Sequence, residues 1–253
     1  MAKNSSESTR DLKHYLDNAA RVAIFTGAGI STESGIPDFR SPGGIWTTNQ
    51  PIMFEDFVSS ANIRKEAWRR KINLERAFKE AAPNRGHRAV ARLVTDGKAS
   101  AVITQNIDNL HQVSGVPADR VIELHGNGTY AKCLDCGQRY ELAPILTAFE
   151  KDETLPTCRE CEGTIKTATV SFGQPMPVEA MRRAEQATLA CDLFIAIGSS
   201  LVVYPAAGFP VMAERNGAKL VILNREPTGF DSIADLVVNE EIGVTLGEAV
   251  GVD

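Results

Sequence analysis

The sequence predicts an α/β fold in which a parallel, doubly wound sheet carries one inserted module. Short apolar runs alternate along the chain with stretches of helical character, and one segment interrupts this alternation. That segment, residues 130–167, is rich in cysteine, charged and turn residues, and we expect no core helix in it. Continuous apolar runs are typical of strands covered on both faces. Strands that alternate with helices favour a parallel sheet.

Six apolar and mostly β-branched runs are the expected strands, at residues 22–26, 101–104, 121–124, 193–197, 219–223 and 236–238. Five stretches between them are the expected helices, at residues 10–20, 63–81, 86–95, 177–190 and 205–216. In a doubly wound sheet, ligands bind beyond the carboxyl ends of the strands. The residues that directly follow the strands are therefore the first candidates for a functional site.

The composition excludes several classes of protein. The chain has 253 residues, of which 43% are hydrophobic and 23% charged, and its net charge is −5. These values are ordinary for a globular protein and exclude a disordered or collagen-like chain. The mild acidity argues against nucleic acid as a partner, because electrostatic binding to phosphates needs a basic surface. No apolar run approaches the length of a transmembrane helix, and the first residues lack the apolar stretch of a signal peptide. We therefore expect a cytoplasmic protein with no membrane partner.

Four of the five cysteines form two CxxC pairs, Cys133 with Cys136 and Cys158 with Cys161, and 21 residues separate the pairs. In a reducing compartment, paired cysteines are more often metal ligands than disulfides. Two CxxC turns at this separation are typical of a four-cysteine zinc ribbon, in which no coordination position is left for water. The sequence therefore predicts one structural Zn²⁺, with redox or disulfide pairs as the disfavoured alternative. Cys191 stands alone and is expected to be a buried apolar residue.

A glycine-rich turn, Gly27-Ala28-Gly29, follows the first expected strand and precedes the start of a helix. Glycines in such a turn let backbone amides approach a phosphate group. The dehydrogenase fingerprint is incomplete, because Thr32 occupies the place of its third glycine and no acidic residue ends the next strand. Taken alone, the turn gives weak support to nucleotide binding, and an ordinary strand-to-helix turn is the alternative.

Two further strand ends carry polar side chains. Gln105, Asn106 and Asp108 follow the second expected strand, where amide and carboxylate groups can hold a ribose hydroxyl and a carboxamide. Turn capping by Asn and Asp is the alternative interpretation. His125 follows the third expected strand and is the best candidate for a general base near neutral pH. The other three histidines are weaker candidates: His14 lies on an expected helix, His87 lies at a helix start, and His111 lies one turn after Asp108.

These segments form an ordered series of motifs. The series is GAGIS at 27–31, GIPDFR at 35–40, TQNID at 104–108, HG at 125–126, the two CxxC pairs, VSFG at 170–173, VYPA at 203–206 and finally Asn224. Taken together, they resemble the sirtuins, the family of NAD-dependent protein lysine deacylases. The resemblance extends from about residue 12 to residue 246, nearly the whole chain.

The resemblance implies a Rossmann-type doubly wound parallel sheet with a smaller inserted zinc-ribbon and helical domain. The large NAD-binding domain would comprise residues 1–42, 83–129 and 168–253. The helical part of the small domain would span 43–82, and the zinc-binding module 130–167. NAD and the acetyl-lysine of a substrate protein would enter the cleft between the two domains.

The resemblance also implies a set of site residues. His125, Asn106 and Asp108 would be catalytic: His125 would accept a proton from a ribose hydroxyl, and Asn106 would orient the ribose and a water. Asp38, Ile107 and Asp108 would form the nicotinamide pocket. The residues expected to contact NAD are Gly27, Ala28, Gly29, Thr32, Asp38, Phe39, Arg40, Gln105, Asn106, Ile107, Asp108, His125, Gly198, Ser199, Ser200, Asn224, Glu241 and Ile242. The residues expected to hold the substrate peptide by β-augmentation are Val170, Phe172, Gly173, Val203 and Tyr204.

The implied function is that of an NAD-dependent protein lysine deacetylase, which transfers the acetyl group of acetyl-lysine to ADP-ribose and releases nicotinamide. The enzymatic alternatives are a longer-chain lysine deacylase and a mono-ADP-ribosyltransferase. A zinc-ribbon nucleic-acid-binding protein and an NAD dehydrogenase are less favoured. The chain departs from the family pattern at Ser199, where Thr is usual, and at Gln174, where Glu is usual. Residues 67–72 contain no Tyr-x-x-Arg pair, which disfavours acidic acyl groups.

Overall fold

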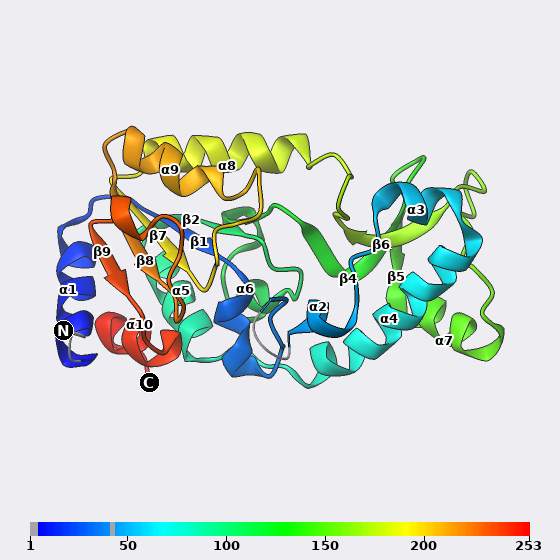
Figure 1. The fold of residues 1–253 in the computed structure, drawn as a ribbon, viewed down its shortest axis with the longest axis horizontal. Coiled ribbons are helices and arrows are strands. Elements are labelled where there is room, and N and C mark those ends of the chain that lie inside the picture. Colours follow the sequence, from blue (N-terminus) through cyan, green and yellow to red (C-terminus); the bar gives the residue numbers. More distant parts are fainter. Residues whose placement is uncertain (1–4, 41–43) are drawn as a thin grey trace.

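The structure, a computed structural model, describes residues 5–40 and 44–253 (Figure 1). Its larger sheet has six parallel strands in the order β3-β2-β1-β7-β8-β9. The strands are β1 (Val22–Thr26), β2 (Ala99–Thr104), β3 (Val121–Glu123), β7 (Leu193–Ile197), β8 (Lys219–Leu223) and β9 (Leu236–Val238). The chain runs outward from β1 in one direction and from β7 in the other. The predicted doubly wound parallel sheet is therefore confirmed.

Helices cover both faces of this sheet (Figure 1). Along β1, Val22 and Ile24 face one apolar cluster and Ala23 and Phe25 face the other, because successive strand residues point to opposite sides. The helices that pack in the first cluster are α1 (Ser5–Asn18), α5 (Arg85–Thr95) and α10 (Ile242–Val250). Those in the second are α8 (Val178–Ala190) and α9 (Gly208–Arg215). Burial on both faces explains why the strands appear in the sequence as continuous apolar runs.

A second sheet is antiparallel, has the order β5-β4-β6 and lies at the other end of the molecule (Figure 1). Its strands are β4 (Gly126–Cys133), β5 (Arg139–Glu141) and β6 (Ile165–Thr169). The helices associated with it are α2 (Ile45–Thr48), α3 (Phe54–Ser59), α4 (Ala61–Glu80) and α7 (Leu142–Asp152). We refer to residues 44–80 and 126–169 as the small lobe. β4 begins before residue 130 and β6 ends after residue 167, so the sheet extends beyond the segment that the sequence sets apart.

Helix α7 contradicts the expectation that segment 130–167 contains no core helix. Leu142, Leu146 and Phe149 lie one turn apart on α7 and are buried in a cluster that includes Trp68 of α4. Three apolar positions are a weak helix signal in a segment rich in turn residues, and a helix this short depends on tertiary packing for its stability. The large aromatic side chain of Trp68, which is distant in sequence, supplies that packing.

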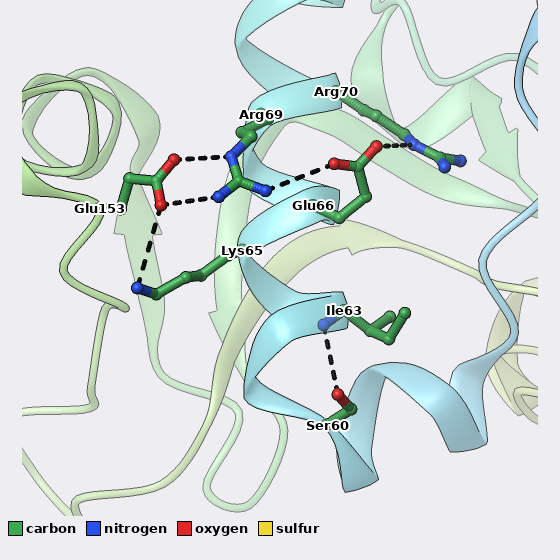
Figure 2. Close-up of polar contacts among 7 residues, drawn as sticks. All are labelled: Ser60, Ile63, Lys65, Glu66, Arg69, Arg70 and Glu153. Carbon is green, nitrogen blue, oxygen red and sulfur yellow. Dashed lines mark hydrogen bonds and ion pairs between the residues drawn. The ribbon is translucent and has the colours of Figure 1, made fainter.

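Charged residues tie α4 to the end of α7 (Figure 2). The Arg69 guanidinium donates two hydrogen bonds to the Glu153 carboxylate, at 2.6 and 2.7 Å, and Lys65 lies 3.9 Å from the same carboxylate. On the other side of Arg69, Glu66 accepts a hydrogen bond from Arg70 at 2.8 Å. The helical part and the cysteine-bearing part of the small lobe are thus joined by a surface network as well as by their shared apolar cluster.

The remaining helical elements are short connections. They are α6 (Leu110–Val113) and three 3₁₀ helices, Ala28–Ser34, Ala118–Arg120 and Asp231–Ile233. Among the helices that the structure describes, none combines the length and the apolarity needed to cross a membrane.

Candidate functional site

The turns that follow β1 and β7 lie against each other at the point where the strand order reverses. The backbone N–H of Gly29 donates to the carbonyl oxygen of Gly198 at 2.8 Å. A Cβ on Gly27 would lie 2.7 Å from that oxygen, and a Cβ on Gly29 would lie 2.7 Å from the Gly198 Cα. Only glycine allows this approach. The close packing of the two turns therefore explains the glycines at positions 27 and 29. The turns lie at the edge of the sheet where doubly wound proteins bind ligands.

A cavity of about 590 Å³ lies at this edge and extends to the small lobe. Its volume is within the usual range of small-molecule sites. Twenty-one of the predicted site residues line it: Gly27, Ala28, Gly29, Thr32, Asp38, Phe39, Arg40, Gln105, Asn106, Ile107, His125, Val170, Phe172, Gly173, Gly198, Ser199, Ser200, Val203, Tyr204, Asn224 and Ile242. Segments that are far apart in the sequence are thus brought into a single cavity.

Two residues predicted to contact NAD do not line this cavity. Asp108 lines a smaller adjoining pocket together with Ile107, which borders both spaces. The Glu241 carboxylate lies 3.0 Å from the Arg225 guanidinium, while its neighbour Glu240 lines the cavity. Asp108 is therefore placed behind the wall of the cavity, and Glu241 beside its rim.

The cavity also has lining residues that are not among the predicted NAD and peptide contacts. Trp46 of α2 is the most prominent: its ring centroid lies 5.1 Å from that of Phe39 and 5.3 Å from that of Phe172, and the Arg40 guanidinium lies 4.2 Å from it. α2 has four residues, too few for a periodic signal. The other additional lining residues are Glu33, Thr169, Ser171, Gln174, Met176, Val202, Pro205, Arg225, Glu226 and Glu240. Most of them stand within two positions of a predicted residue, which is the signal that could have found them.

His125 is held by the backbone of the neighbouring strand end. Its Nδ1 lies 3.1 Å from the carbonyl oxygen of Gln105. A carbonyl only accepts, so Nδ1 carries the proton and the lone pair of the neutral ring resides on Nε2. Burial lowers the pKa of His125, and the nearby positive charge of Arg40 acts in the same direction, whereas the Gln105 hydrogen bond opposes them. The side chain of Gln105 is itself fixed, because its Oε1 accepts a hydrogen bond from Ser199 Oγ at 2.8 Å.

Ser31 connects two of the polar residues predicted after β2. Its hydroxyl donates to Asp108 Oδ2 at 2.7 Å and accepts from Asn106 Nδ2 at 3.1 Å. The other carboxylate oxygen of Asp108 accepts from the backbone N–H of Leu110 at 2.9 Å. Burial raises the pKa of Asp108, although these hydrogen bonds act against the rise. The side chains of Asn106 and Asp108 are therefore fixed by local geometry before any ligand binds.

The two predicted peptide-binding segments lie on the cavity. The first, Val170 to Gly173, follows β6, and its Val170 N–H donates to the carbonyl oxygen of His125 at 2.8 Å. The second contains Val203 and Tyr204, and the Tyr204 side chain is 68% exposed. An exposed aromatic ring beside a cavity offers apolar contact area to an incoming chain.

The four predicted metal-ligating cysteines converge. Their Sγ atoms all lie within 4.8 Å of one another, and two of the separations are 3.5 Å (Cys133 to Cys161) and 3.6 Å (Cys136 to Cys158). A tetrahedral zinc site with Zn–S distances of about 2.3 Å separates its sulfurs by about 3.8 Å. The donor set therefore fits one Zn²⁺. The lining of the large cavity includes none of these cysteines, all of which the structure describes.

Comparisons with known proteins agree with this arrangement. A family model described as "Sir2 family" matches residues 27–205. A protein of Rhodopseudomonas palustris named "NAD-dependent protein deacetylase" is 57% identical over 251 residues, covering 99% of both chains. A Bradyrhizobium diazoefficiens protein named "NAD-dependent protein deacetylase 1" is 58% identical over 251 residues, covering 99% of this chain and 98% of the other.

The fold is similar to solved Sir2 structures. One, of a histidine-to-alanine Sir2 variant with a deacetylated p53 peptide and 3′-O-acetyl ADP-ribose, has a TM-score of 0.89 and 36% identity, covering 96% of this chain and 98% of that one. Another, described as Sir2 with a p53 peptide and NAD⁺, has a TM-score of 0.85 and 37% identity, covering 94% of this chain and 95% of that one.

Proposed function

The chain belongs to the Sir2 family, and from this we propose that it is an NAD-dependent protein lysine deacetylase. In the proposed reaction, NAD, an acetyl-lysine side chain and water give free lysine, nicotinamide and O-acetyl-ADP-ribose, so that the acetyl group passes to the ADP-ribosyl group of NAD. Relatives of more than half identity over the full length carry the name of this activity. The substrates are acetylated proteins, and we place the enzyme in the cytoplasm.

The observation that carries the proposal is the orientation of His125 in the wall of the cavity. Its Nδ1–H is committed to the Gln105 carbonyl, and its pKa is lowered by burial. The ring is thus neutral at pH 7, with an Nε2 lone pair that can accept a proton from a ribose hydroxyl. NAD, when bound, supplies the ADP-ribosyl group that accepts the acetyl group. His125 supports acyl transfer to that group, because removal of the proton makes the hydroxyl a better nucleophile.

The fixed amide and carboxylate groups suit the two ends of NAD. Asn106 is held by Ser31 and orients the ribose, while Ile107 and Asp38 form the nicotinamide pocket with Asp108 behind them. Gly27, Ala28 and Gly29 bring backbone amides to the phosphates. Ser199, Ser200 and Asn224 hold the adenosine side of the molecule. The remaining predicted NAD residues complete the lining, except Glu241, which we place beside the adenine.

The substrate chain enters between Val170–Gly173 and the segment of Val203 and Tyr204. Both segments line the cavity and can pair with an extended peptide through their backbone groups. Cys133, Cys136, Cys158 and Cys161 hold one Zn²⁺, which stabilises the small lobe and takes no part in the reaction, because four thiolates leave no open coordination position.

An acetyl-lysine peptide, incubated with the protein in the presence and absence of NAD, tests the proposal by mass spectrometry. The expected result is loss of the acetyl group only with NAD, together with O-acetyl-ADP-ribose in equal amount. A matched peptide with unmodified lysine is the control for ADP-ribose transfer. Deacylation of butyryl or longer peptides without deacetylation would instead indicate a longer-chain deacylase. Mass gain of ADP-ribose on either peptide would indicate a mono-ADP-ribosyltransferase.

A further inference from the structure

Lys166 of β6 is a lysine whose side chain is almost completely buried. The residue is 4% exposed, and no carboxylate lies within ion-pair distance of its ammonium among the residues that the structure describes. Burial lowers the pKa of Lys166 to about 8, with no charged group contributing to the shift. A buried cation without a counter-charge is costly. Fold stability therefore does not explain why a lysine occupies this position.

The ammonium is satisfied by backbone oxygens. Nζ donates to the carbonyl of Thr169 at 2.5 Å and to that of Thr167 at 3.4 Å. The ring of Phe57 in α3 lies on its remaining side, with the ring centroid 5.9 Å from Nζ. Lys166 thus lies between the antiparallel sheet and α3, and its strongest contact is with the last residue of β6.

Thr169 is the point from which the first peptide-binding segment begins. The next residue, Val170, donates its N–H to the carbonyl oxygen of His125 at 2.8 Å. Further along, the Phe172 carbonyl accepts the N–H of Phe54, the first residue of α3, at 2.8 Å. The segment Val170–Gly173 is therefore fixed at one end to the proposed base and at the other end to α3. Lys166 contacts the residue that precedes this segment, through the Thr169 carbonyl, and the helix that holds its other end, through Phe57.

We propose that Lys166 is a positioning residue for the acylated peptide: its ammonium fixes the Thr169 carbonyl and so sets the edge Val170–Gly173 against His125 and α3. This inference rests on the proposed function, because it assigns the segment to the substrate. Lys166 does not line the cavity and does not touch the reacting groups. It acts on substrate binding through the backbone of Thr169 and Val170, and not on the chemical step.

The test compares Lys166→Met and Lys166→Arg with the wild-type protein, and uses Lys151→Met, an exposed lysine on α7, as the matched control. Steady-state kinetics gives KM for an acetyl-lysine peptide, KM for NAD and kcat. Anisotropy of a labelled acetyl peptide gives its Kd without NAD. Zinc content and thermal unfolding are measured on the same samples. Met has a length similar to that of Lys and leaves no cavity, so loss of the charge is the main change.

We expect Lys166→Met to raise the peptide KM and Kd about tenfold, because the charged hydrogen bond that fixes the Thr169 carbonyl is lost. We expect kcat and the KM for NAD to change by less than about twofold, since only peptide binding depends on this edge. The melting temperature should not fall, because the change removes a buried cation without a counter-charge. Lys166→Arg should recover part of the peptide affinity, and Lys151→Met should equal the wild type.

An unchanged peptide KM in Lys166→Met, beside an active wild type, would overturn the assignment and leave the proposed function standing. Equal losses in peptide and NAD binding with lower zinc content or melting temperature would also overturn it, by showing a general structural role. A wild-type protein that neither binds nor deacetylates the peptide would refute the proposed function and the assignment together.

Discussion

The Nδ1 atom of His125 lies 3.1 Å from the backbone carbonyl oxygen of Gln105. The Gln105 side chain in turn accepts a hydrogen bond from Ser199 at 2.8 Å. One residue therefore links the proposed base on the end of β3 to the turn that follows β7. The orientation of the imidazole is set by groups that also line the NAD end of the cavity.

His125→Ala should lower kcat for deacetylation by about 10²–10⁴-fold, the usual contribution of a general base. The affinity for NAD should change little, because the many other lining residues remain. Turnover of an acetyl-lysine peptide and NAD binding by calorimetry are the measurements. The matched control is His14→Ala, an exposed histidine on α1, which should have wild-type turnover. Substantial activity in His125→Ala would remove the base assignment.

The pH profile of the wild-type enzyme should have an acid limb below the ordinary histidine value of 6.5. Burial lowers the pKa of His125, so its neutral, basic form persists to lower pH than that of an exposed imidazole. Activity is present above the pKa of His125 and is lost as pH falls through it. The measurement is kcat/KM for the acetyl peptide in the free-enzyme regime, from pH 4.5 to 8. An acid limb with its midpoint at or above pH 6.5 would contradict the conclusion that burial lowers the pKa of His125.

Zinc analysis should give one ion per chain, and Cys136→Ser should lose it. Without the metal the small lobe should become sensitive to proteases. The two CxxC turns are then no longer joined through a shared ion, and zinc binding drives the folding of such modules. Emission spectrometry and limited proteolysis are the measurements. Cys191→Ser is the matched control, since burial raises the pKa of this distant thiol to about 11 and it lies outside the sulfur cluster. A stable, zinc-free wild-type protein would refute the metal site.

Stability should fall as pH falls from 6.5 toward 4, through the buried histidines His87 and His111. Burial lowers their pKa values to about 4 and about 3, and their rings lie 5.1 Å apart. In this window the unfolded chain binds protons that the folded chain excludes. Each histidine therefore lowers the free energy of unfolding by about 1.4 kcal/mol per pH unit.

Urea unfolding of the zinc-loaded protein at pH 7, 6 and 5 measures this dependence. His111→Gln should make the slope smaller than that of the wild type by about 1.4 kcal/mol per pH unit, the contribution of one histidine. The comparison cancels the contributions of carboxylates whose pKa values are raised by burial, such as Asp108 and Glu123, because both proteins contain them. The exposed His14→Gln should keep the wild-type slope, and an unchanged slope in His111→Gln would refute the prediction.

The sheet could be predicted from the sequence because its signal is local. Continuous apolar runs such as 22–26 and 193–197 are long enough to mark strands buried on both faces, and all six expected strands are present. Helix α7 could not be predicted, since its stability depends on Trp68 of α4, which is distant in sequence. The role of Trp46 in the cavity could not be predicted for a related reason. Its contacts with Phe39 and Phe172 form only when the small lobe has packed.

By itself, the sequence determined the doubly wound sheet, the four zinc-ligating cysteines and the identity of the residues at the strand ends. Each of these features depends on a local sequence pattern: apolar runs, CxxC pairs, and polar residues that directly follow a strand. Only the tertiary structure decided that Nδ1 of His125 faces the Gln105 carbonyl, that Asp108 lies behind the cavity wall, and that Lys166 is buried without a counter-charge. These properties depend on contacts between distant segments, which set the burial and hydrogen bonding of each group and therefore its protonation.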